Sequence, residues 1–118
     1  MQEDTSLSGA SKGEFRGGSS ITLDVKDFPY AYYTNTIVKK ISQSWTWSDT
    51  FGNLKTLVFF RIQNDGSLSE ISVNKPSGDG YFDQQALRAV TLASPFPPLP
   101  AGYKENSLGV YFEFFYSE

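Results

Sequence analysis

The sequence predicts an α+β domain of two layers, in which two helices pack on one face of a three-stranded antiparallel sheet. Three observations carry this prediction. Two strand-like runs flank an Asn-Asp-Gly-Ser turn, a helical stripe lies on either side of that hairpin, and a long alternating run closes the chain. The element order is (β)-α-β-β-α-β, where the first strand is short. A length of 118 residues supports one domain, which we expect over residues 25–118 after a flexible linker at 1–24.

The hairpin lies between Lys55 and Lys75. Its first run, Thr56–Gln63, is rich in β-branched and aromatic residues that alternate between two faces, as in a half-buried strand. The second run shows the same alternation. Asp65-Gly66 between them tolerates the positive φ angles of a tight turn, so the two runs should pair as neighbours.

A first helix is predicted over Tyr30–Trp45. Large apolar residues recur there at steps of three and four, which places them on one face of a helix. We expect Asp27 near the N-cap and Pro29 in the first turn. The stripe is expected to pack against the sheet, and it consists of Tyr30, Tyr33, Ile37, Ile41 and Trp45.

A second helix is predicted over Tyr81–Ala93, with Asp79 as its N-cap. The proline-rich segment Pro95–Pro100 ends it, because proline has no N–H and disfavours helix before it. The PxxP spacing there also occurs in ligands of SH3 domains, but we expect a rigid connector to the last strand. The apolar stripe of this helix consists of Phe82, Ala86, Ala89, Val90 and Ala93.

The last strand is predicted over Leu108–Tyr116, antiparallel to the first strand of the hairpin. If it is outermost, its unpaired N–H and C=O groups offer an edge to an extended peptide, because Glu113 is its one charged residue and it has no proline. Alternatively, that edge is covered by a second copy of the chain or by the alternating run Ser20–Lys26. The aromatic side chains placed in the core could instead line a peptide groove.

Enzymatic chemistry is not expected. The chain has no Cys and no His, so a serine nucleophile lacks its usual base and the commonest metal ligands are missing. Capping explains Asp79 and Asp83, and the residues after Asp65-Gly66 lack the ligand spacing of a calcium loop. We predict no catalytic residue, no cofactor and no metal. A net charge of −3 also disfavours nucleic acid as a partner.

Several motifs together resemble the C-terminal domain of the TonB family of energy transducers. They are the Asp-Gly hairpin, the Ser-Gly break after it, the helix that reads DQQALRAV and the connector FPPLP. The preceding FPYAYY and the helix that ends in Trp45 resemble the entry helix of the family, in a form also similar to TolA. The resemblance covers about residues 25–117.

This resemblance implies a periplasmic domain, anchored to the inner membrane of a Gram-negative bacterium in the full-length protein. Such domains bind the TonB box of outer-membrane transporters by β-augmentation, and with inner-membrane motor proteins they couple proton-motive force to uptake, including siderophore transport. Two alternatives are a TolA-like domain that binds periplasmic proteins and supports envelope integrity, and a self-pairing module that forms a homodimer. The implied partner-binding residues are Ser107, Leu108, Gly109, Val110, Tyr111, Phe112, Glu113, Phe114, Phe115 and Tyr116.

Overall fold

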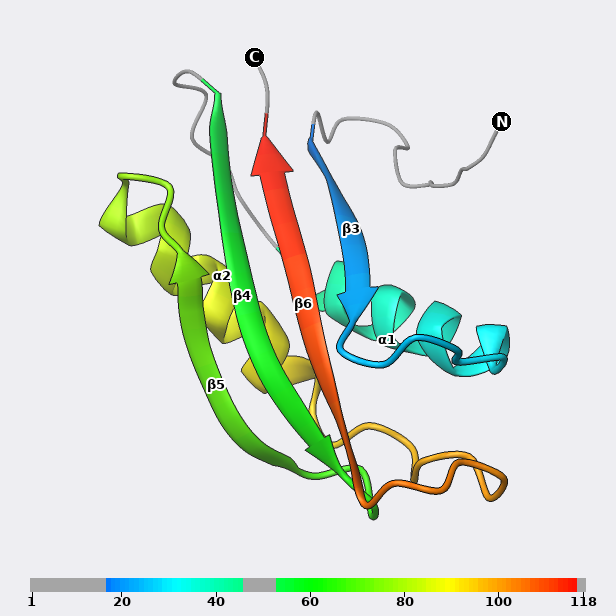
Figure 1. Ribbon diagram of the computed structural model, residues 1–118. Helices are drawn as coiled ribbons and strands as arrows, with labels where there is room; N and C mark the ends of the chain where they lie inside the picture. Colours follow the sequence, from blue (N-terminus) through cyan, green and yellow to red (C-terminus); the bar gives the residue numbers. More distant parts are fainter. Residues whose placement is uncertain (1–16, 46–52, 117–118) are drawn as a thin grey trace.

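The computed structural model describes residues 17–45 and 53–116, and these form one antiparallel sheet with two helices. The sheet has four strands in the order β3-β6-β4-β5, each antiparallel to its neighbours (Figure 1). The strands are β3 (Gly17–Leu23), β4 (Leu54–Gln63), β5 (Leu68–Lys75) and β6 (Ser107–Tyr116). The strands β4 and β6 are therefore interior.

The prediction of three strands is wrong by one, because β3 is a full member of the sheet. A strand was expected from Ser20 to Lys26, but it begins at Gly17 and gives way to a bend after Leu23. The Gly-Gly-Ser-Ser half of β3 has no apolar alternation, so the sequence gives no sign of a strand there. This half of β3 is held in the sheet by backbone pairing with β6 and not by buried apolar side chains.

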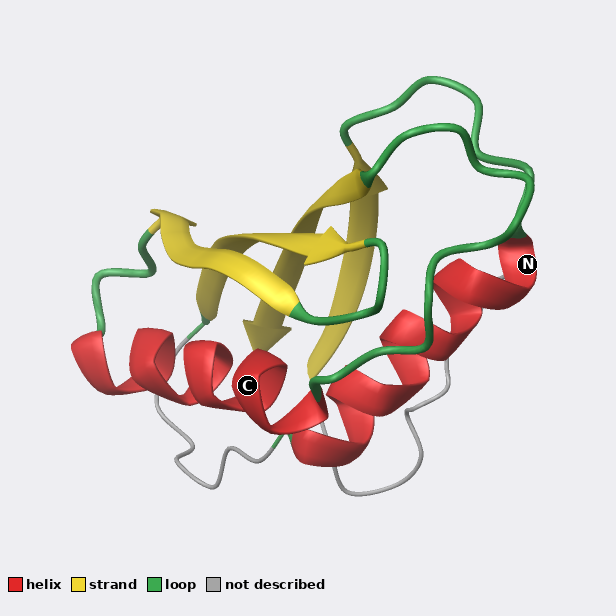
Figure 2. Ribbon diagram, turned by 90° about the horizontal axis from the view of Figure 1, so that it is seen from below, coloured by secondary structure: helices red, strands yellow, loops and turns green. Residues whose placement is uncertain are grey.

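The helices α1 (Ala31–Ser44) and α2 (Gly80–Ala93) cover the same face of the sheet (Figure 2). The core lies between the two layers. Every member of the predicted stripe of α2 is buried there, and so is the centre of the stripe of α1, whose end residues Tyr30 and Trp45 are partly buried. From the sheet, the inner faces of β4 and β6 supply Val58, Phe60, Ile62, Leu108, Val110, Phe112 and Phe114.

The two helices begin differently. Asp79 caps α2 as predicted, because its Oδ1 accepts hydrogen bonds from the N–H groups of Tyr81 and Phe82, both at 3.0 Å. The prediction for α1 is wrong. Its N-cap is Tyr30, without a side-chain cap, so Asp27 and Pro29 lie in the segment that approaches the helix.

The hairpin turn is built around Gly66, whose φ of 95° favours glycine. The connector from α2 to β6 packs against this turn. The N–H of Phe96 donates to the Gly66 carbonyl at 2.9 Å, and the N–H of Leu99 donates to the Asn64 carbonyl at 3.0 Å. Phe96 and Leu99 are buried, so the proline-rich segment forms part of the core boundary, as expected of a connector.

Tyr33 joins the first helix to the same connector. Its ring is buried and its hydroxyl donates to the Pro97 carbonyl at 2.6 Å. Burial, with a smaller contribution from Tyr32, raises the pKa of Tyr33 from 10.0 to about 12. In the native state this phenol therefore stays protonated where an unfolded tyrosine ionises.

We predict that the free energy of unfolding falls more steeply with pH in the native chain than in Tyr33→Phe. The stabilising contribution is fully present below the unfolded pKa of 10.0 and is lost as pH rises toward about 12, because the unfolded state releases its proton first. Near neutral pH the variant should be about 1 kcal/mol less stable, since it loses one hydrogen bond. Urea unfolding between pH 7 and 12 measures both effects. Parallel curves for the two chains would contradict this role of Tyr33.

Candidate functional site

The predicted binding residues all lie on β6, which runs between β3 and β4. Alternate residues of β6 point into the core, so Phe112, Phe114 and Tyr116 are buried under the helices and do not line a groove. The residues between them lie on the outer face. The outer face of β6 carries partly exposed side chains, among them Tyr111 and Glu113.

The edge of β6 that faces away from β4 is occupied by β3. The two strands are paired over all of β3, from Gly17 opposite Tyr116 to Leu23 opposite Val110. Of the arrangements that the sequence left open, the structure shows the one in which the N-terminal run covers the edge. The final strand is therefore not outermost in this structure.

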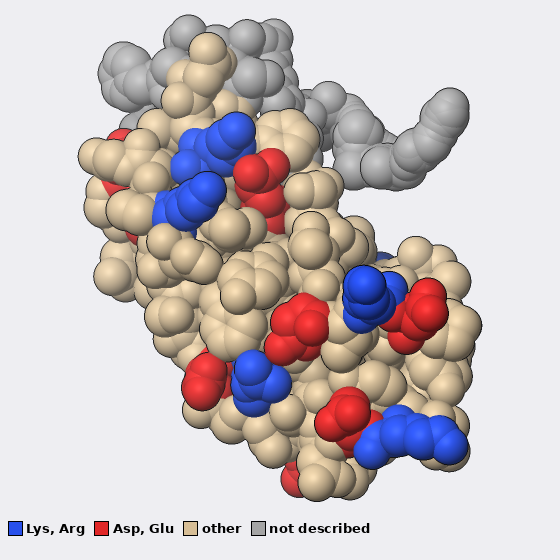
Figure 3. All heavy atoms as spheres, in the orientation of Figure 1, with Lys and Arg blue, Asp and Glu red and all other residues tan. Residues whose placement is uncertain are grey.

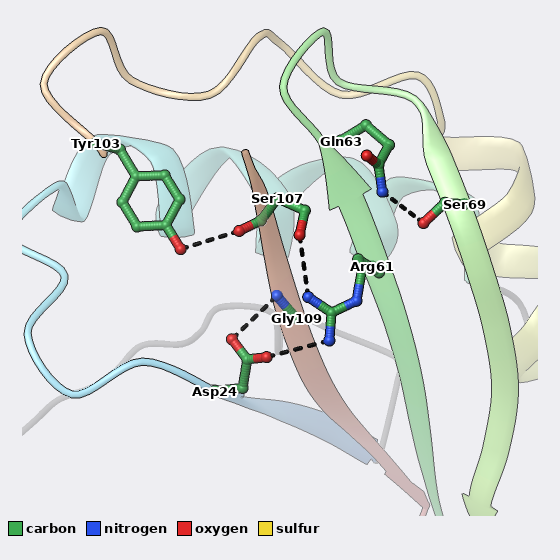
Figure 4. Close-up of polar contacts among 7 residues, drawn as sticks. All are labelled: Asp24, Arg61, Gln63, Ser69, Tyr103, Ser107 and Gly109. Atoms are coloured by element: carbon green, nitrogen blue, oxygen red, sulfur yellow. Dashed lines mark hydrogen bonds and ion pairs between the residues drawn. The ribbon is translucent and has the colours of Figure 1, made fainter. Parts of the chain in front are cut away.

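A cluster of polar groups fixes the point where β3 leaves β6 (Figure 4). The N–H of Asp24 donates to the Gly109 carbonyl at 3.0 Å, and the Gly109 N–H donates to Asp24 Oδ1 at 3.1 Å. Arg61 Nη2 lies 3.4 Å from Asp24 Oδ2, while its Nη1 donates to Ser107 Oγ at 3.1 Å. We call Asp24, Arg61, Ser107 and Gly109 the Asp24 cluster.

The ion pair in the Asp24 cluster is partly exposed, with 32% of the Arg61 side chain and 31% of the Asp24 side chain accessible. Pairs of this exposure contribute little stability on their own, typically about 0.2–1 kcal/mol. The geometry of this pair matters more than its strength, because the Asp24 carboxylate binds both the Gly109 N–H on β6 and the Arg61 guanidinium on β4. The cluster thus ties the end of β3 to two neighbouring strands.

Gly109 is required at this place for steric reasons. A Cβ on Gly109 would overlap the carboxylate of Asp24, so any larger residue would force that side chain away. The next support is Tyr103, whose hydroxyl donates to the Ser107 carbonyl at 3.0 Å. Burial, with Asp24 and Glu105, raises the pKa of Tyr103, while Arg61 lowers it, so the phenol remains a donor at neutral pH.

Sequence reasoning did not find the Asp24 cluster. Asp24 and Gly109 are 85 residues apart, and Asp24 stands at the end of what was taken for a linker. Arg61 shows no motif beyond its place on the outer face of a strand. Because contacts between distant polar residues carry no periodicity, only the three-dimensional structure brings these residues together.

The outer face of the sheet also carries a small aromatic pair. The rings of Phe59 and Tyr111 lie 4.9 Å apart on adjacent strands, and the Arg61 guanidinium lies 5.5 Å from the Phe59 ring centre. Acidic and basic side chains are interspersed over this face, without a field of one sign (Figure 3). Such a surface does not resemble the basic footprint of a nucleic-acid-binding protein.

Two further findings concern the described part of the chain. No group of three or more His, Cys, Asp or Glu side chains there could hold a metal ion. None of the described helices is long and apolar enough to cross a membrane.

The described residues form a four-stranded antiparallel sheet with two helices on one face, and one known family matches most of this fold. The family described as TonB C terminal matches residues 30–114, so the chain belongs to this family. No curated protein matches the chain. The match begins after β3 and covers α1, β4, β5, α2 and β6 as far as Phe114. The strand that occupies the edge of β6 therefore lies outside the segment that matches the family.

Among solved structures, the chain is similar to the solution structure of TolAIII bound to a peptide derived from the N-terminus of TolB. The two are 27% identical with a TM-score of 0.52, and the match covers 63% of this chain and 60% of that chain. The present chain thus spans about three fifths of the TolA chain that it matches.

We predict that Gly109→Ala displaces the Asp24 side chain and lowers the free energy of unfolding by about 1–3 kcal/mol, since a buried N–H loses its acceptor. Gly80→Ala is the matched control, because a Cβ at Gly80 meets open space at the start of α2. Urea unfolding gives the stability, and NMR shifts of Asp24 and Arg61 report the ion pair. Unchanged shifts in Gly109→Ala would contradict this description of the cluster.

Proposed function

We propose that this domain binds an extended peptide segment of an envelope protein by adding that segment as a strand to β6, at Ser107–Tyr116. One observation carries the proposal. The outer edge of β6 accepts a strand of seven residues, β3, that lies outside the segment matching the family. Strand addition obtains affinity from main-chain hydrogen bonds and specificity from alternate side chains, which needs no catalytic group.

Under this proposal, the residues of β6 that bind the peptide are those whose backbone N–H and C=O groups point toward β3. The N–H and C=O of Gly109 both point to the segment that follows β3. In an antiparallel ladder these groups alternate along a strand, so those of Tyr111, Glu113 and Phe115 face the same way. The groups of Val110 and Phe112 face β4 and hold the sheet together. A partner strand would thus form backbone hydrogen bonds with every second residue of β6.

Membership of the TonB C-terminal family supports a particular partner, the TonB box of an outer-membrane transporter. In this proposal the domain works in the periplasm without catalytic activity. A part of the protein beyond this chain anchors it to the inner membrane, where motor proteins couple proton-motive force to uptake, for example of siderophores. The sheet would carry the mechanical load from the peptide to the rest of the protein.

A second candidate is favoured by the similarity to TolAIII, which was solved with a TolB peptide bound. In that case the partner would be a periplasmic protein, and the role would be in envelope integrity rather than uptake. Both candidates use an extended peptide on the same sheet. They differ in which peptide binds, so direct titration separates them.

The test is an amide NMR titration of the chain with peptides from its own organism. One set is copied from the plug-side termini of outer-membrane transporters and the other from the N-terminus of a TolB-type protein. We expect shifts centred on Ser107–Tyr116. Binding of the first set supports the TonB-type function, and binding of the second supports the TolA-type function.

A matched control uses the same peptides with single N-methylated amides. Because an added strand donates alternate N–H groups to β6, a single methyl group should abolish binding at every second position of the peptide. At the positions between, where the N–H points away from β6, a single methyl group should be tolerated. Shifts confined to the free edge at Leu68–Lys75, or no binding by any peptide of the folded domain, would contradict the proposal.

A further inference from the structure

The strand β3 is held on the sheet chiefly through its backbone. Its outward residues Ser20 and Thr22 are exposed, and its inward residues Ile21 and Leu23 are only partly buried. The neighbouring β6, in contrast, buries five large side chains in the core. Since stabilisation grows with the apolar area buried, at about 25 cal/mol per Å², β3 contributes far less to the core than β6 does.

The place of β3 at the start of the described chain allows it to detach from the sheet without displacing another element. It precedes α1, and besides β6 its main contact is with that helix. The segment that matches the family covers residues 30–114, so it holds α1, β4, β5, α2 and most of β6 but not β3. Detachment of β3 would leave β4, β5, β6 and both helices in place.

The Asp24 cluster supplies side-chain interactions that hold the end of β3 on the sheet. Beyond the ladder itself, Asp24 forms two hydrogen bonds with Gly109 and an ion pair with Arg61. Its carboxylate fills space that only a glycine leaves open on β6. The place beside Gly109 and Arg61 is therefore shaped for a carboxylate carried by a strand that pairs with β6.

We propose that β3 is an intrachain substitute for the partner peptide, and that the partner displaces it by running antiparallel to β6 with an acidic residue against Gly109 and Arg61. This inference rests on the proposed function and defines the chemistry of its ligand. By analogy with β3, the peptide has aliphatic residues at the two inward positions, opposite Phe112 and Val110, and the acid directly after them.

The first experiment fixes β3 in place. The chain has no Cys, so Ser20→Cys with Glu113→Cys introduces one defined disulfide across a directly opposed pair on the outer face. Hydrogen-bonded antiparallel pairs have Cα atoms about 5.5 Å apart, within the range that a disulfide spans. We expect the oxidised chain to lose peptide binding. The reduced form of the same chain lacks the Glu113 side chain but keeps every backbone group of β6, so peptide binding that returns on reduction is due to release of β3.

The probe is a synthetic peptide with the sequence of residues 17–26, GGSSITLDVK, titrated into the full labelled chain and followed by NMR. The variant Asp24→Ala in the chain weakens the intrachain strand but leaves Gly109 and Arg61 free for the aspartate of the peptide. It should bind the peptide about fivefold or more tightly than the native chain does, as loss of about 1 kcal/mol from the competitor predicts. Asp27→Ala, an exposed acid three residues later, should change nothing.

The acid requirement is tested with the peptide GGSSITLAVK, which lacks the aspartate. It should bind Asp24→Ala several-fold more weakly than the probe does, and Arg61→Gln in the chain should reduce that difference. Equal binding of the probe to the oxidised and reduced chains, no gain in Asp24→Ala, or equal affinity of the two peptides would overturn the inference. If the probe binds as expected but no envelope peptide binds, the result supports displacement of β3 and contradicts the proposed function.

Discussion

An interior strand needs a partner on both of its edges, and this requirement at β6 determines how the molecule is arranged. The N–H and C=O groups on the edge of β6 opposite β4 need partners, which β3 supplies in this structure and which water or another strand would supply if β3 were detached. The chain meets the requirement with β3, a strand of low apolar content that backbone pairing and the Asp24 cluster retain. The remaining elements, α1, α2 and the β4–β5 hairpin, form most of the core together with the inward side of β6, and β3 adds the partly buried Ile21 and Leu23.

Under the proposed function, this arrangement separates stability from recognition within one strand. The inward residues of β6, such as Phe112, provide core packing, whereas the backbone groups that pair with β3 in this structure are those that we propose pair with a peptide. A domain whose function is to hold a peptide under load benefits from the division, because the exchange of one edge strand for another leaves the core intact. The chain belongs to the TonB C-terminal family and is similar to a structure of TolAIII bound to a TolB peptide, and both findings support the proposal that it binds a peptide.

The sequence predicted most of the fold because most of it follows from periodicity and caps. The hairpin around Asp65-Gly66, the stripes of both helices and the Asp79 cap all have local signals, and each appears in the structure. The start of β3 was missed because Gly-Gly-Ser-Ser has no alternation. The Asp24 cluster was missed because its members are distant in sequence and ordinary in type, so no local rule could place Asp24 on Gly109.

Amide hydrogen exchange of the free chain tests the proposal that β3 separates from the outer edge of β6 without unfolding of the domain. The N–H groups of Gly109, Tyr111 and Glu113 face β3, while those of Val110 and Phe112 face β4. If β3 detaches alone, the first set exchanges faster than global unfolding allows, and the second set exchanges only through it. Equal protection of both sets, at the level of global unfolding, would show that β3 is an inseparable part of the core and would contradict the account.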